Sequence, residues 1–330
     1  MDINLVIENS DNKNIYKPVI SDTIKWITDI EGSAGKLEFD VVKKGSDIDI
    51  NNKLALNFRE GNSIKLFVDD KSVFSGFIFV KNRDKKNIIS VTAFDQLRYL
   101  KNKDTYVYEN MNASNLLKLI CQDFNLCLGN VDDTPFIIES CIEQNTTLFD
   151  IINNAINMTY KNTGQLYVLF DDFGKISLKN ICNMKLNFKI DESVIENFSC
   201  ETSIDDNTYN RVKLYYSDDR KKESIVFVEE DKNSIEKYGV LQYFEKVSFD
   251  ENFNIKAKTI LNSHNDKSRS LSIKNALGNF DVRAGSVILV SLNIGDVILN
   301  DWFVVKKCTH NITSYNHTMD LELYNEFREI

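Results

Sequence analysis

The chain has 330 residues, enough for two or three domains at roughly 150 residues each. Hydrophobic residues make up 42% and charged residues 27%, the balance of an ordinary soluble globular protein. The formal net charge of −9 argues against a protein that binds nucleic acid by neutralising phosphates, because such a protein needs a basic face.

The N-terminus and the apolar runs indicate where the protein is made. No apolar run approaches the ~20 residues that span a bilayer. Residues 1–5 (MDINL) do not form the start of a signal peptide. We therefore expect synthesis in the cytosol, no secretion by the general route and no membrane insertion.

Cysteine, proline and glycine usage indicates a rigid protein with reduced thiols. The six cysteines are scattered and include no Cys-x-x-Cys pair, so we expect small packing residues rather than a metal site or disulfides. Only 2 prolines and 12 glycines occur, which excludes long flexible linkers of those residues. Any domains are expected to be joined closely.

The first hundred residues predict strands. Apolar residues alternate with others along 63–68, and 73–80 is a second β-rich run across a polar turn. A third β-rich run spans 88–94. Several short strands separated by charged turns are typical of an antiparallel barrel or sandwich.

Residues 101–182 predict a small α+β unit. From Asn112, a plausible N-cap, apolar residues recur at helical spacing. A second helix starts at Thr147, with Asp150 at the third helical position as in a capping box. A hairpin at 166–178 follows.

Residues 183–330 are again mainly β. One helix interrupts them at about 252–264. Residues 302–311 and 317–323 predict a long terminal hairpin, whose second arm alternates between apolar and polar residues. The pattern predicts one sheet face in the core and one in solvent.

The two β-rich ends share a faint similarity. Residues 61–66 (GNSIKL) are echoed by 284–289 (AGSVIL), and an aromatic strand follows each, at 74–78 and 302–305. A chance match of β-rich hairpins and a true internal repeat explain this equally well. A true repeat would mean two related barrels, one at each end of the chain.

The histidines offer one candidate metal site. His310 and His317 lie on opposite arms of the terminal hairpin, where they are able to face one another. A metal would need a third ligand, and only Asp320 and Cys308 are near. Histidines in hairpins are far more often surface or packing residues, so we assign no metal ligands.

No catalytic constellation stands out. Gly-x-Ser-x-Gly, His-Glu-x-x-His and phosphate-binding-loop motifs are absent, while a triad from distant parts of the chain is left open. Asp171 and Asp172 resemble paired glycosidase carboxylates, but a hairpin turn favours the same residues. We assign no catalytic or cofactor-binding residue and no cofactor, and we expect an assembly component rather than an enzyme.

One segment carries a specific resemblance. Residues 91–106 (VTAFDQLRYLKNKDTY) closely resemble the segment that ends the first domain in baseplate hub proteins of contractile phage tails and tail-like bacteriocins, of the type in the PBSX prophage of Gram-positive bacteria. Residues 74–78 resemble that family's strand with an aromatic-x-Gly motif. Residues 285–323 resemble its C-terminal block, and the order and spacing agree over nearly the whole chain.

The resemblance implies an architecture. It is mainly β with an α+β middle part, in which two tube-like antiparallel β-barrel domains flank a small α+β domain. On this interpretation the first barrel is 1–100, the α+β domain is 101–182 and the second barrel is 183–330, with a small insertion at about 218–277.

The resemblance also implies a task. Family members are structural, non-enzymatic hubs that assemble as homotrimers. Their six barrels form a pseudo-hexamer that adapts the six-fold tail tube to the three-fold central spike. The expected partners are the tail tube protein or a tube initiator above, the spike below and other baseplate proteins. The protein would be made in the bacterial cytoplasm and assembled into a virion or tail-like particle, without specific nucleic-acid binding.

Two alternatives come from other functional classes. A tail-associated cell-wall hydrolase is one, since some hub proteins carry a fused hydrolase domain, but we expect no room for one after the second barrel. A cell-wall-binding module that uses exposed aromatic residues is the other. Only two tryptophans, Trp26 and Trp302, are present, and Trp302 lies in a strand with the pattern of a core.

Overall fold

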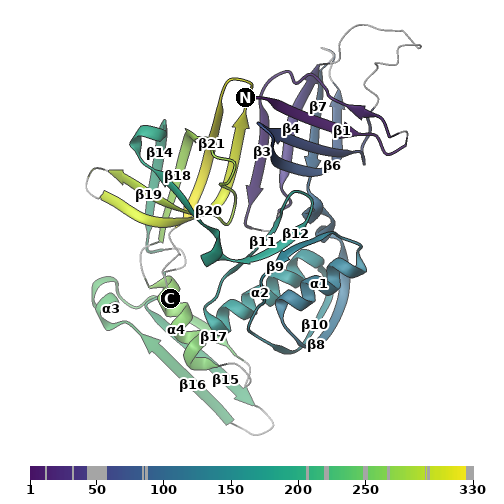
Figure 1. Ribbon diagram of the computed structural model, residues 1–330. Coiled ribbons are helices and arrows are strands. Elements are labelled where there is room, and N and C mark those ends of the chain that lie inside the picture. Colours follow the sequence, from purple (N-terminus) through teal and green to yellow (C-terminus); the bar gives the residue numbers. More distant parts are fainter. Residues whose placement is uncertain are drawn as a thin grey trace, which may run out of the picture.

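The computed structural model describes residues 1–324 apart from 12, 32, 43–57, 84, 86–87, 206–207, 219–222, 248–251, 266–267, 294 and 296–297. The chain is mainly β, and a 13-stranded sheet runs through its N-terminal and C-terminal parts. An α+β middle part and a smaller sheet with helices lie beside that large sheet (Figure 1). The expected class, mainly β with an α+β middle part, is confirmed.

The N-terminal part supplies seven strands, which include the three predicted runs at 63–68, 73–80 and 88–94. In β4, for example, Leu37, Phe39 and Val41 are buried while the residues between them are partly exposed. The buried rows of these strands form one core cluster. The strands are β1 (Ile3–Glu8), β2 (Ile15–Tyr16), β3 (Ile24–Asp29), β4 (Lys36–Val42), β5 (Ser63–Val68), β6 (Lys71–Arg83) and β7 (Ile88–Phe94).

The middle part contains both predicted helices with their predicted caps. The side chain of Asn112 accepts the backbone N–H of Asn115 at 3.0 Å, and Thr147 accepts that of Asp150 at 3.1 Å. The helices pack on one core cluster. The elements are η1 (Gln96–Lys101), β8 (Lys103–Met111), α1 (Ala113–Asp123), β9 (Leu128–Val131), β10 (Ile138–Thr147), α2 (Leu148–Thr163), β11 (Tyr167–Asp171), β12 (Ile176–Asn180) and η2 (Ile181–Met184).

The C-terminal part returns to the large sheet. Its two last strands form the predicted terminal hairpin, in which Ile312 lies opposite His317. Their buried faces form a third core cluster. The elements are β13 (Lys185–Ile190), η3 (Glu192–Val194), β14 (Asn197–Ser203), β18 (Ser268–Leu277), β19 (Val287–Asn293), β20 (Ile298–Ile312) and β21 (His317–Tyr324).

Between β14 and β18 the chain leaves the large sheet to form a separate unit. Its three strands pair in the order β16-β15-β17, and α4 packs on them through its own small core. The predicted helix is present with Asn252 as its N-cap. The unit begins earlier than 218, and β18, inside the expected insertion, belongs to the large sheet. The elements are β15 (Arg211–Asp218), β16 (Glu223–Glu230), α3 (Lys232–Tyr238), β17 (Gln242–Lys246) and α4 (Phe253–His264).

The strand orders of the two ends of the chain are the same. The N-terminal part pairs as β1-β5-β6-β7-β4-β3, and the C-terminal part pairs as β13-β19-β20-β21-β18-β14. The one difference in direction is that β1 is antiparallel to β5 whereas β13 is parallel to β19. Antiparallel pairing of β3 with β20 joins the two series. Among the described strands these pairings form a branched open path and no closed barrel.

Local geometry repeats at the same points of the two series. A glycine with positive φ precedes both β5 and β19, and the same pair of backbone hydrogen bonds ties each turn to the next strand. The four bonds run from Gly61 N to Ile78 O (2.7 Å), Ile78 N to Asn62 O (3.0 Å), Gly285 N to Val305 O (2.8 Å) and Val305 N to Ser286 O (2.8 Å).

A bulge also recurs. The pairing of β6 with β7 shifts between Ile78 and Val80, and the pairing of β20 with β21 shifts between Val305 and Lys307. Bulges bend a strand at a defined position, so a shared bulge is a specific feature of a fold. The faint sequence similarity therefore lies in equivalent strands of two equivalent units, which favours an internal repeat over a chance match.

Candidate functional site

The first polar cluster lies where the two strand series meet. His310 Nδ1 is 2.9 Å from His317 Nε2, so the two rings face one another as predicted. His310 Nε2 is also 2.9 Å from the carbonyl oxygen of Val282. One assignment of protons satisfies both contacts: His310 donates from Nε2 to Val282, and His317 donates from Nε2 to His310.

Both imidazoles are held neutral. Burial lowers the pKa of His310 to about 3 and that of His317 to about 4. Their flat faces are covered by aromatic rings, since Trp26 of β3 stacks on His310 at 4.6 Å and Phe280 stacks on His317 at 3.9 Å. The pair thus acts as a packed, hydrogen-bonded joint between β3 and the terminal hairpin.

The two candidate third ligands lie differently. Cys308 Sγ is 3.2 Å from His310 Nε2, and burial raises the pKa of its thiol. Asp320 instead accepts the backbone N–H of Asn275 at 3.0 Å and lies 3.7 Å from Lys274. In the described part of the chain, no group of three or more His, Cys, Asp or Glu side chains is arranged to hold a metal ion.

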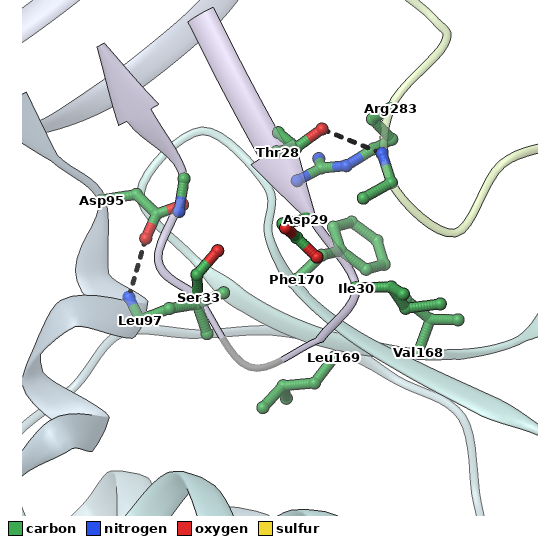
Figure 2. A pocket seen from close by; sticks show the side chains of 12 residues that line it. Thr28, Asp29, Ile30, Ser33, Asp95, Leu97, Val168, Leu169, Phe170 and Arg283 are labelled. Atoms are coloured by element: carbon green, nitrogen blue, oxygen red, sulfur yellow. Dashed lines mark hydrogen bonds between the residues drawn. The ribbon is translucent and has the colours of Figure 1, made fainter. Parts of the chain in front are cut away.

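The second polar cluster surrounds a small pocket where the three parts of the chain meet (Figure 2). The turn between β3 and β4, the start of η1, strand β11 and the loop before β19 all reach it. Its free space of about 10 Å³ is at the lower limit for one water molecule. The lining residues are Thr28, Asp29, Ile30, Ser33, Gly35, Asp95, Leu97, Val168, Leu169, Phe170, Arg283 and Ala284.

Asp95 organises this junction. Its carboxylate accepts the backbone N–H of Gly35 at 2.8 Å and that of Leu97 at 3.0 Å, so it caps η1 and fixes the β3–β4 turn. Burial raises the pKa of Asp95 well above its usual value, and the neighbouring Asp171 adds to the rise. Asp95 lies within residues 91–106, so the segment that carries the family resemblance is also the segment that joins the parts.

Asp171 ties the middle part to the same point. It accepts the backbone N–H of Gln96 at 3.3 Å and that of Gly174 at 2.6 Å. Burial raises the pKa of Asp171 to about 6. Asp172 and Lys175 exchange backbone hydrogen bonds, so the two acidic residues belong to a hairpin turn, as the turn interpretation predicted.

Arg283 supplies the opposite charge from the C-terminal part. Its guanidinium lies over the ring of Phe170, with Cζ 4.3 Å from the ring centroid. Its positive charge lowers the pKa values of Asp95 and Asp171 and so counteracts part of the rise that their burial causes. Nearby, Thr28 Oγ1 accepts the backbone N–H of Ala284 at 2.9 Å. The junction therefore holds three chain segments together by charge and by hydrogen bonds.

Sequence reasoning identified the histidine pair but missed this junction. Asp95 and Arg283 carry no local signal of burial, and their proximity depends on the tertiary fold. Both tryptophans contact other parts of the protein. Trp26 is buried, and Lys185 Nζ lies 3.9 Å from the centroid of the Trp302 ring. Over the described residues, we find no helix with the length and apolar character needed to cross a bilayer.

Comparison with known proteins places these features in a family. The chain is 30% identical over 270 residues to YqbQ of Bacillus subtilis (strain 168), covering 80% of this chain and 81% of that protein. It is 29% identical over 270 residues, with the same coverage, to the phage-like element PBSX protein XkdQ of the same organism.

Solved structures share the fold at low sequence identity. The 43 kDa tail protein of prophage MuSo2 from Shewanella oneidensis has a TM-score of 0.69 and 11% identity, with 98% of each chain covered. The E. coli c3393 protein, a type VI secretion component described as similar to the T4 tail proteins gp27 and gp5, has a TM-score of 0.60 and 7% identity, covering 100% of this chain and 78% of that one. The fold is therefore that of phage tail proteins. Since the model of the YqbQ-like family matches residues 24–324, the chain belongs to the YqbQ-like family.

Proposed function

We propose that this protein is the structural hub of a contractile-tail baseplate, in a phage or a tail-like bacteriocin. It acts as a homotrimer that adapts the six-fold tail tube to the three-fold central spike. The single observation that carries the proposal is the matching strand order of the two ends of the chain. Three chains with two equivalent units each supply six similar positions, which is the number a six-fold tube requires.

The proposed division follows the strand pairings. Residues 1–100 form the first tube-like unit, 101–182 the α+β domain, and 183–330 the second tube-like unit with its insertion between β14 and β18. The junction of Asp95, Asp171 and Arg283 holds these three parts in a fixed relation, which a rigid adaptor needs. The tube protein or tube initiator binds above and the spike below, together with other baseplate proteins.

The role is non-enzymatic and requires neither a cofactor nor specific nucleic-acid binding. The likeness to tail proteins and to a type VI secretion component supports assembly rather than catalysis. The protein is made in the bacterial cytoplasm and becomes part of the particle.

Light scattering behind a sizing column tests the proposal. We expect a species near three times 38.1 kDa, alone or after addition of the spike protein from the same particle. Purified particles should contain the chain at the tube–spike boundary in electron micrographs. A protein that stays monomeric with the spike present, or that lyses peptidoglycan in zymography, would favour the cell-wall alternatives instead.

A further inference from the structure

The repeat assigns a partner to two strand edges that pair with no further strand among the described residues. β3 and β14 are equivalent strands, yet β3 pairs with both β4 and β20 whereas β14 ends the described strand order beside β18 alone. The C-terminal half of β20 pairs with β3. The equivalent C-terminal half of β6 pairs, among the described residues, with β7 alone. Each chain thus has a second pair of edges, on β14 and β6, that is equivalent to the pair already joined inside the chain, on β3 and β20.

We propose that β14 of one copy pairs antiparallel with residues 80–83 of β6 in a second copy, reproducing the β3–β20 joint between subunits. The inference deepens the proposed hub function, and it rests on that proposal for the number of subunits in the ring. A contact of this head-to-tail kind generates a ring when its rotation closes and a filament when it does not.

Matching series of cross-strand partners fix the register. Each series starts on the outer strand (β3 or β14), follows the residues that lie opposite one another on the next two strands, and ends at the residue before the bulge of β6 or β20. In the N-terminal unit the series is Trp26, Leu37, Ala93 and Ile78. In the C-terminal unit it is Cys200, Leu271, Leu323 and Val305.

The internal joint then gives the intermolecular one. Within the chain, Ile27 lies opposite Thr309 and Thr28 lies opposite Cys308. The equivalent pairs between two copies are Glu201 opposite Asn82 and Thr202 opposite Lys81.

A threonine that makes a side-chain hydrogen bond at the internal joint has a threonine as its equivalent on β14. Thr28 Oγ1 accepts the backbone N–H of Ala284, which precedes Gly285. The residue equivalent to Thr28 is Thr202, and the one equivalent to Ala284 is Glu60, which precedes Gly61. Thr202 and Glu60 are both exposed in the single chain. Between copies, the Glu60 N–H therefore donates to Thr202 Oγ1.

The surface properties of the two edges suit this pairing. Val80, at the start of the β6 edge, is 52% exposed although it is apolar. Arg83 at the end of that edge and Glu201 on β14 are exposed and opposite in charge. Open strand edges are templates for pairing with another chain, so covering both protects the protein from disordered association.

Cysteine cross-linking of the full chain tests the register. In the Asn82→Cys/Glu201→Cys variant, oxidation should give covalent dimers and trimers and no larger species. Six strands lie between the two positions within one chain, so the link must be intermolecular. The Ile27→Cys/Thr309→Cys variant is the matched reference, since the same register inside one chain should give a disulfide without a gain in mass.

Controls separate register from simple proximity. The Asn82→Cys/Asn197→Cys variant displaces one cysteine by four residues along β14, about 13 Å, and should give about tenfold less product. Each single variant measures the background from the native cysteines. Thr202→Val should reduce the trimer fraction in light scattering, whereas Thr202→Ser should restore it.

The outcomes distinguish this inference from the proposed function. A trimer by light scattering that gives no Asn82–Glu201 link would overturn the edge pairing and leave the hub function standing. Links of equal yield in both variants, or an unlimited ladder of products, would also overturn it. A chain that is monomeric at every concentration, alone and with the spike, would contradict both.

Discussion

His310 and His317 share a hydrogen bond of 2.9 Å between Nδ1 and Nε2, inside a stack of Trp26 and Phe280. Because β3 supplies Trp26 and the terminal hairpin supplies both histidines, the bond lies at the joint between the two repeated units. A charge on either imidazole would have no acidic partner in this stack. Packing at this joint therefore opposes protonation of either imidazole.

The histidine pair predicts a loss of stability in mild acid. Folding lowers the pKa values of His310 and His317 to about 3 and about 4, below the ~6.5 of the unfolded chain. The unfolded state then binds more protons, so stability is complete above pH ~6.5 and falls as the pH drops towards 4. The loss should be on the order of 2 kcal/mol per histidine at pH ~5.

Urea unfolding of a His310→Gln/His317→Gln variant checks this effect. The variant should be less stable than the natural chain at pH 8 but should lose less stability between pH 8 and 5. His264→Gln serves as a control for a histidine outside the stack. An unchanged pH slope in the double variant would contradict this account, because it would mean that folding does not lower the pKa values of the pair.

Asp171 predicts the opposite sign in the same pH range. Burial raises its pKa to about 6, above the ~3.9 of the unfolded chain, so the folded state holds the proton more tightly. The stability it contributes is present below pH ~4 and is lost as the pH rises through ~6. An Asp171→Asn variant lacks this loss, and relative to the natural chain it should gain on the order of 1 kcal/mol between pH 5 and 8.

The exposed neighbour gives the matched control for this prediction. Asp172→Asn removes a charge one residue along the exposed turn, and because that charge makes only the smallest contribution to the raised pKa of Asp171, the variant should weaken the pH dependence far less than Asp171→Asn does. Equal pH slopes for Asp171→Asn and the natural chain would mean that Arg283 and the backbone N–H groups fully offset the burial of this carboxylate.

Local elements followed from sequence because their causes are local. The N-caps at Asn112 and Thr147, the hairpin at 166–178 and the terminal hairpin were all predicted from residue type and periodicity. The junction was not, because Asp95 and Arg283 are brought together only by the pairing of distant strands. The start of the insertion was missed for the same reason, since a strand such as β15 alternates alike whichever sheet it joins.

The aromatic-x-Gly motif in β6 now has a physical reason. A Cβ on Gly76 would overlap the backbone oxygen of Phe94 and press on the ring of Phe74. Neither neighbour is a flexible side-chain end, so a strand must shift. Gly76→Ala should cost more than about 2 kcal/mol of unfolding free energy, measured by urea titration. Ser75→Ala in the same strand should cost about 0.5 kcal/mol or less, and equal effects of the two would contradict this account.

A carboxylate shared by two lysines links the inserted unit to the middle part. Lys256 of α4 is 1% exposed, and its Nζ lies 3.0 Å from Glu245 Oε1. Lys161 of α2 reaches the same oxygen at 3.3 Å. Glu245 therefore neutralises a cation that water hardly reaches and links the two units at once.

Removing the two charges should have unequal effects. Glu245→Gln takes a carboxylate away from the buried Lys256 charge and should cost about 3 kcal/mol, because breaking a buried ion pair is strongly destabilising. Lys256→Met removes the buried charge while Glu245 keeps Lys161, so its cost should be smaller. The double variant should be more stable than Glu245→Gln alone.

As a reference, Glu31→Gln, which breaks the exposed pair with Lys306, should change stability by about 0.5 kcal/mol or less. Equal losses for Glu245→Gln and Glu31→Gln in urea unfolding would show that water reaches Lys256 and that the link carries little energy.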